Sequence, residues 1–102
     1  MRLVLPLLLA SATFASAHEW YAPSCCSGQD CARIAVSSVE IAPAGFIVRL
    51  DSAEHVQVSR RFEETVPYSS HKLRKSRDGD FHACISLARQ ELICLYAPEF
   101  PG

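Results

Sequence analysis

The sequence lacks the short motifs that mark the commonest catalytic sites. It contains no Gly-x-Ser-x-Gly nucleophile turn, no His-Glu-x-x-His zinc motif and no glycine-rich phosphate loop. It also has no Cys-x-x-Cys pair of the thioredoxin type. The carboxylates in its polar stretches are isolated, and none forms an evident acid–base pair. These absences favour a protein that is not an enzyme.

An excess of charge of one sign is also missing. The chain of 102 residues carries 10 basic and 11 acidic residues, a formal net charge of −1 with neutral histidines. That balance creates no general attraction to nucleic acid. After residue 17, no apolar run approaches the ~20 residues that a membrane-spanning helix needs. We therefore expect no nucleic-acid partner and no membrane span in the mature chain.

The start of the chain is typical of a secretory signal. Arg2 precedes the apolar stretch 3–10, and Ala15-Ser16-Ala17 places small residues where a signal peptidase cuts. Cleavage after this triplet predicts a signal peptide, 1–17, and one small domain, 18–102, that is periplasmic or secreted. Cleavage two residues earlier and retention of the segment as an anchor are the alternatives.

All five cysteines lie in the predicted mature domain: Cys25, Cys26, Cys31, Cys84 and Cys94. Disulfides are expected in an oxidising compartment, and they stabilise domains whose core is small. Because the number is odd, one thiol is left over, and it could link two chains into a dimer. Zinc is disfavoured, since the paired cysteine and histidine spacings of zinc sites are incomplete.

Two bridging patterns are open. A local pattern joins Cys84 to Cys94, with Cys31 bonded to Cys25 or Cys26. A long-range pattern joins the N-terminal cysteines to the C-terminal ones, for example Cys26 to Cys94 or Cys84. In the chain-entropy model a loop of about 11 residues contributes about 2.8 kcal/mol and one of about 69 residues about 4.4 kcal/mol. We favour at least one long-range bridge.

Alternating apolar and polar residues predict short strands in the first half of the domain. Asp30 could cap a single helical turn over 31–33. Residues 36–41 and 46–51 then suggest a hairpin around Gly45. Val56 and Val58 alternate with polar neighbours, which suggests a third short strand.

The clearest strand pattern lies near the end of the chain. Apolar runs 81–87 and 92–96 flank a polar link, and symmetric pairing about Arg89 sets Cys84 opposite Cys94 and Ile85 opposite Ile93. We expect a small all-β or β-rich domain of hairpins or a meander, with at most one short helix. Its N-terminal arm should be tethered by a disulfide and packed through Trp20 or Tyr21.

Residues 60–80 show the weakest pattern. They include a basic run made of His71, Lys72, Arg74, Lys75 and Arg77. Such a run could bind an anionic partner. We favour a solvated loop whose cations pair with nearby carboxylates such as Glu63 and Glu64, because the run is short and the domain is slightly acidic.

Cleavage after Ala17 would make His18 the first residue of the mature protein. Its α-amino nitrogen and its imidazole Nδ1 could chelate copper, and a second histidine would complete a T-shaped site. This arrangement resembles the histidine brace of periplasmic copper carriers and lytic polysaccharide monooxygenases. The candidate second ligands are His55, His71 and His82, and we choose His82 because the C-terminal hairpin should lie beside the N-terminal cysteines. A terminal histidine without metal is the alternative that we favour.

Four blocks of the sequence carry a family resemblance. They are His18-Glu19-Trp20-Tyr21; Cys25-Cys26-Ser27-Gly28 with Asp30-Cys31; Asp78-Gly79 with His82 and Cys84-Ile85; and Cys94-Leu95-Tyr96 with Pro98. Together they resemble a family of small exported bacterial and phage-encoded proteins that is functionally uncharacterised. The resemblance implies export and the five-cysteine layout, and it assigns no catalytic or binding residue.

These observations lead to one main hypothesis and two alternatives. The main hypothesis is an exported, non-enzymatic structural or protein-binding module of the cell envelope, with an envelope protein as its partner. The first alternative is a periplasmic copper-binding protein that uses His18. The second is an inhibitor of an envelope enzyme such as a lysozyme, which rests on size, export and disulfides alone.

Overall fold

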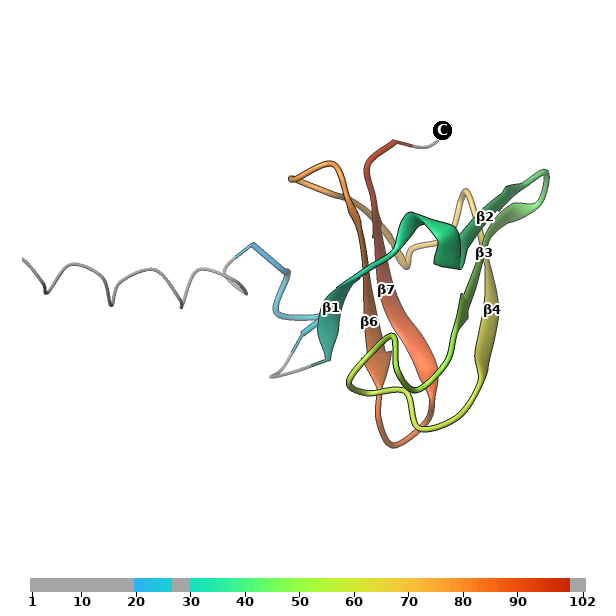
Figure 1. The fold of residues 1–102 in the computed structure, drawn as a ribbon. Helices are drawn as coiled ribbons and strands as arrows, with labels where there is room; N and C mark the ends of the chain where they lie inside the picture. Colours follow the sequence, from blue (N-terminus) through green and yellow to red (C-terminus); the bar gives the residue numbers. More distant parts are fainter. Residues whose placement is uncertain (1–19, 27–29, 100–102) are drawn as a thin grey trace, which may run out of the picture.

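The protein folds into two β-sheets that pack against each other, which confirms the predicted β-rich class (Figure 1). The computed structural model describes residues 20–26 and 30–99. The predicted signal peptide, His18, residues 27–29 and residues 100–102 lie outside the described part. The described elements are β1 (Cys31–Ile34), the 3₁₀ turn η2 (Val36–Ser38), β2 (Val39–Ala42), β3 (Gly45–Leu50), β4 (Phe62–Pro67), β5 (Leu73–Lys75), β6 (Phe81–Ser86) and β7 (Glu91–Ala97).

One sheet has four strands in the order β1-β6-β7-β5, and the other has three in the order β2-β3-β4. All pairings are antiparallel except that between β5 and β7. Strands contribute alternate side chains to each face, so apolar residues of both sheets meet between them. This core includes Phe46, Val48, Val66, Leu73, Ala83, Ile85, Leu92 and Leu95. The opposite face of the four-stranded sheet, here called the outer face, is free to receive the N-terminal arm.

Both predicted hairpins are present. The strands β2 and β3 pair around a turn at Pro43-Ala44, but the first strand is shorter than predicted, because residues 36–38 form η2. In the second hairpin, Cys84 lies opposite Cys94 as predicted. The predicted pair Ile85–Ile93 is wrong, because Ile85 faces Leu92 instead. A β-bulge shifts the register after Cys84, and it places an extra residue in β7.

Two short segments differ from the sequence expectations. Residues 31–33 belong to strand β1 and not to a capped helical turn, because β6 offers this segment a partner strand. The stretch around Val56 and Val58 is a turn and not a strand. Val58 is buried there while Val56 is 64% exposed, whereas a strand would place these two side chains on the same face.

The region 60–80 is more ordered than its pattern suggested, since it contains β4 and β5. Glu64 explains why β4 was missed. Its register partner on β3 is the core residue Val48, so this carboxylate points inward. There it accepts hydrogen bonds from the backbone N–H of Leu92 at 3.0 Å and from Lys72 Nζ at 2.7 Å. An inward carboxylate breaks the alternation by which a strand is recognised.

Helical structure in the described part of the chain is limited to a single 3₁₀ turn, η2. No helix there has the length and apolar character needed to cross a membrane.

Candidate functional site

Two disulfides fix the N-terminal arm on the outer face of the four-stranded sheet. Cys25 bonds to Cys94 and Cys31 bonds to Cys84, with sequence separations of 69 and 53 residues. The expectation of at least one long-range bridge is therefore confirmed, but the example that used Cys26 is wrong, and so is the local Cys84–Cys94 alternative. Cys84 has a cysteine opposite it on each neighbouring strand, and it bonds to the one on β1. Both bonds are compatible with an oxidising compartment.

Cys26 is the candidate cysteine that stays outside both bridges. Its side chain is partly buried and packs against the cluster that holds the two disulfides. The suggestion that an odd cysteine joins two chains stays a prediction.

Four aromatic rings pack together where the arm meets the sheet. Trp20 lies 4.7 Å from Tyr21, 4.7 Å from His82 and 5.0 Å from Tyr96, measured between ring centroids. The contacts with His82 and Tyr96 are edge-to-face, a favourable arrangement for aromatic pairs. The backbone N–H of Ala22 also donates to the Tyr96 hydroxyl at 2.8 Å. These contacts confirm that Trp20 and Tyr21 pin the arm to the domain.

A chain of hydrogen bonds runs from Asp78 through His82 to Tyr21. His82 Nε2 lies 2.9 Å from both carboxylate oxygens of Asp78, so Nε2 carries the proton. The other ring nitrogen, Nδ1, accepts from the Tyr21 hydroxyl at 2.8 Å. Partial desolvation opposes ionisation of Asp78, but hydrogen bonds from His82, Asp80 N–H and the Ser76 hydroxyl outweigh it and lower the pKa of Asp78 to about 2.

This Asp–His–Tyr chain has the connectivity of a catalytic relay, but its chemistry favours an anchor. Burial, followed by the nearby Cys26 and Asp78, raises the pKa of Tyr21 to about 12. The phenol is therefore neutral at ordinary pH, and a neutral buried phenol is a poor nucleophile. Tyr21 is only 9% exposed and its hydroxyl points to a buried imidazole. The chain attaches the arm to β6 and to the loop that carries Asp78.

The histidines proposed as second copper ligands occupy three different settings. His82 uses both ring nitrogens, so binding copper would require it to break a hydrogen bond. His55 is buried, donates from Nε2 to Ala83 O at 2.8 Å and accepts at Nδ1 from Gln57 N–H. His71 is exposed. Within residues 20–26 and 30–99, no group of three or more potential ligand side chains could hold a metal. The copper site at His18 stays a prediction.

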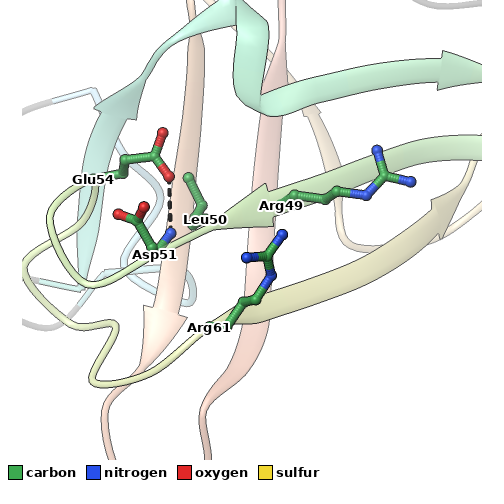
Figure 2. Close-up of a pocket in the computed structure, with 5 residues that line it drawn as sticks. All are labelled: Arg49, Leu50, Asp51, Glu54 and Arg61. Carbon is green, nitrogen blue, oxygen red and sulfur yellow. Dashed lines mark hydrogen bonds between the residues drawn. The ribbon is translucent and has the colours of Figure 1, made fainter.

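Figure 2 shows a small hollow beside the end of β3. Arg49 and Arg61 lie on one side of it, and Asp51 and Glu54 lie on the other, with Leu50 between. Its volume of about 70 Å³ has room for only a few waters. Arg49 is already paired with carboxylates of β2 and β4, at 2.8 and 3.3 Å. The hollow is thus a poor ligand site.

The cations of the basic run differ in whether the protein supplies them with a partner. Lys72 pairs with Glu64, as predicted for a solvated run with carboxylate partners. Arg74 differs, because its Nε is buried and has no hydrogen-bond partner among the described residues. It lies on β5 beside Tyr96 of β7, and so at the margin of the aromatic cluster.

The tip of the β2–β3 hairpin is an apolar surface. Residues 41–47 contain no polar side chain, and Ile41 is 70% exposed. Val36 of η2, which precedes β2, is 72% exposed. The hairpin extends at the upper right of Figure 1, on the opposite side of the molecule from the arm.

Sequence reasoning found the cysteines, the arm and His82 but not the partners of His82. The sequence predicts packing for Tyr21 without a defined contact, and Asp78 enters the sequence analysis only as part of a block that carries the family resemblance. The signal for Asp78 was its spacing four residues before His82, which becomes informative only when the loop is known to fold back on β6.

Comparison of the chain with protein-family models, with curated proteins and with solved structures found no match. The family resemblance of the four sequence blocks therefore stays a prediction.

Proposed function

We propose that the protein is an exported, non-enzymatic protein-binding module of the cell envelope that uses the β2–β3 hairpin tip as its main contact. The observation that carries this proposal is the apolar tip at residues 41–47, in which Ile41, Pro43 and Ala44 are exposed. Export is supported by the signal-like residues 1–17 and by two disulfides, which persist in oxidising compartments.

The tip is held firmly, and this favours binding. The Tyr68 hydroxyl donates to Ala42 O at 2.6 Å, and the Tyr68 ring contacts buried Phe46 edge-on. Lower in the hairpin, Arg49 bonds to Glu40 across the strands. A preorganised loop loses little conformational entropy on binding, so more of its contact energy appears as affinity.

A protein with an apolar cleft fits this tip better than a bilayer does. Surfaces that bind anionic membranes usually surround their apolar residues with lysine, arginine or tryptophan. Here the nearest arginine along the hairpin, Arg49, is neutralised between Glu40 and Glu63. An apolar hairpin that enters a cleft is also a common way to block an enzyme, so inhibition of an envelope enzyme is one form of this function.

The experiment places a photo-crosslinking amino acid at Ile41 in the full-length chain expressed in cells. A matched control carries the same group at Arg89, an exposed residue in the β6–β7 link. We expect a discrete adduct from position 41 that is absent from position 89. With the partner identified, Ile41→Glu should raise the dissociation constant at least about tenfold, whereas Val56→Glu, at an exposed apolar residue elsewhere, should not.

Equal adducts from both positions, or unchanged affinity of Ile41→Glu, would overturn the proposal. The adduct could instead contain a second copy of the chain. If sedimentation then shows a dimer that Ile41→Glu dissociates, the tip mediates self-association and does not bind another protein. If the purified protein co-sediments with phospholipid vesicles and Ile41→Glu does not, the tip binds a bilayer and not a protein partner.

A further inference from the structure

A row of side chains across the outer face places an arginine on each side of the aromatic cluster. In the strand register, Arg33 on β1 lies opposite His82, His82 lies opposite Tyr96, and Tyr96 pairs with Arg74 on β5. Residues paired across strands point to the same face. Neighbouring strands are about 4.8 Å apart, so the backbones of the two arginines are about 14 Å apart.

Trp20 covers the middle of this row. Its indole contacts His82 and Tyr96 and remains partly exposed. A fixed, partly exposed indole between two cations is an amphipathic surface. The apolar face of a ring can stack on the indole while polar groups at the edge of that ring reach the arginines.

The two arginines are available for an external anion. Neither Arg33 nor Arg74 takes part in an ion pair with any described residue, whereas the neighbouring Lys72 is paired with Glu64. The buried Nε of Arg74 has no protein partner in the described chain. A buried donor without a protein partner commonly marks a position completed by water or a bound ion. A guanidinium binds a carboxylate best, through two parallel hydrogen bonds.

Asp78 decides which kind of anion fits. Its carboxylate lies against His82 in the same row, and the hydrogen bonds that it accepts keep it ionised. A nucleic acid or polyphosphate has dense charge that this carboxylate would repel, and the net charge of the chain is −1. Sugars carry neutral hydroxyl groups that can donate to a carboxylate, whereas the phosphates of a nucleic-acid backbone can only accept hydrogen bonds.

We propose that the outer face binds an acidic oligosaccharide, with one sugar ring stacked on Trp20 and sugar carboxylates on Arg74 and Arg33. A linear chain of a few sugars would extend over both arginines. This site lies on the opposite side of the molecule from the hairpin tip, so it does not depend on the protein-binding function proposed above (Figure 1).

The test uses the only tryptophan in the sequence, Trp20, as the reporter. Hexagalacturonate is titrated into the mature protein while tryptophan emission is followed, and the fully methyl-esterified hexamer is the uncharged control. We expect a saturable change with the acid form and at least about tenfold weaker binding of the ester. Arg74→Gln should weaken binding of the acid form about tenfold, and Arg61→Gln, at an exposed arginine just before β4, should not.

Arg74→Lys keeps the charge but removes the bidentate geometry, so it should bind between the wild type and Arg74→Gln. This variant keeps the test decisive if Arg74→Gln folds poorly. Equal binding of acid and ester, or full affinity in both Arg74 variants, would overturn the proposal. So would tighter binding of single-stranded oligothymidylate than of hexagalacturonate.

Discussion

His55 lies inside the molecule although it belongs to a turn. It is 3% exposed, and its ring joins the loop between β3 and β4 to the main chain of β6 at Ala83. Nδ1 must be unprotonated to accept the hydrogen bond from Gln57 N–H, so the native structure needs the neutral ring. The residue that looked like a candidate copper ligand is therefore part of the framework.

Stability should fall in mild acid because of His55. Burial lowers the pKa of His55 from its usual 6.5, partly offset by its hydrogen bond to Ala83. As the pH falls below ~6.5, the unfolded chain takes up this proton before the folded chain does. The contribution of His55 is thus complete above that pH and is lost below it, with a slope of at most about 1.4 kcal/mol per pH unit. Urea unfolding between about pH 8 and about pH 5 measures the slope.

The matched variants are His55→Gln and His71→Gln. The first should flatten the slope in this range, and the second, at an exposed histidine, should leave it unchanged. A wild-type slope in His55→Gln would show that another group controls the acid response.

Glu64 links the two sheets through a single carboxylate. Glu64→Ala leaves Leu92 N–H and the Lys72 ammonium without their acceptor, so we expect a loss of about 1–3 kcal/mol in the free energy of unfolding. Glu63→Ala, on the exposed face of the same strand, should cost no more than about 1 kcal/mol. Chemical denaturation of the two variants makes the comparison, and equal losses would contradict an inter-sheet role.

At the scale of elements, the β2–β3 hairpin depends on one close approach. A Cβ at Gly45 would lie 2.2 Å from the carbonyl oxygen of Val66 on β4, and the residue has φ +154°. Gly79 also has a positive φ, +83°, but nothing lies within 4 Å of its Cβ position. Substitution of Gly45 therefore tests a steric clash together with the backbone conformation, and substitution of Gly79 tests the backbone conformation alone.

We expect Gly45→Ala to destabilise the protein by about 3 kcal/mol, since β4 must move away from β3. Gly79→Ala should cost about 1–2 kcal/mol, because only the unfavourable positive φ of the backbone contributes there. Thermal unfolding of both variants tests the order. A larger loss at Gly79 would show that the two strands tolerate separation.

The hairpins could be predicted from sequence because their apolar residues alternate. Strand β1 could not, because its four residues show no such period and Asp30 imitates a helix cap. Its strand conformation follows from pairing with β6, a contact between residues far apart in the sequence. The same missing strand concealed the disulfide pattern. The opposed pair Cys84 and Cys94 suggested a local bridge that does not form, because the strand that supplies the partner of Cys84 was absent from the prediction.

The candidate sites were less predictable than the strands. The tip at residues 41–47 reads as an ordinary apolar hairpin, and only the structure shows Ile41 to be exposed. Arg74 belonged to a run that was read as solvated, and Lys72 in that run does have a carboxylate partner. Which cation is paired depends on Glu64 pointing inward, and a local pattern cannot show that.

At the scale of the whole molecule, the two bridges hold the arm against a small core. Removing the Cys25–Cys94 bridge with paired alanines should cost about 4 kcal/mol, because it closes a long loop in the unfolded chain. Cys26→Ser should change stability by less than about 1 kcal/mol, since this cysteine forms no bridge. Denaturation under non-reducing conditions measures both, and a larger loss in Cys26→Ser would contradict the pairing.

The bridges are also nested, because the segment closed by Cys31–Cys84 lies inside the one closed by Cys25–Cys94. A single cut in the exposed turn at 51–54 would leave two fragments joined by both sulfur–sulfur bonds and by one shared core. Such a nicked molecule would run as one band without reductant and as two with it. In a compartment rich in proteases, the outer face and the hairpin tip would both persist after the backbone had been cut.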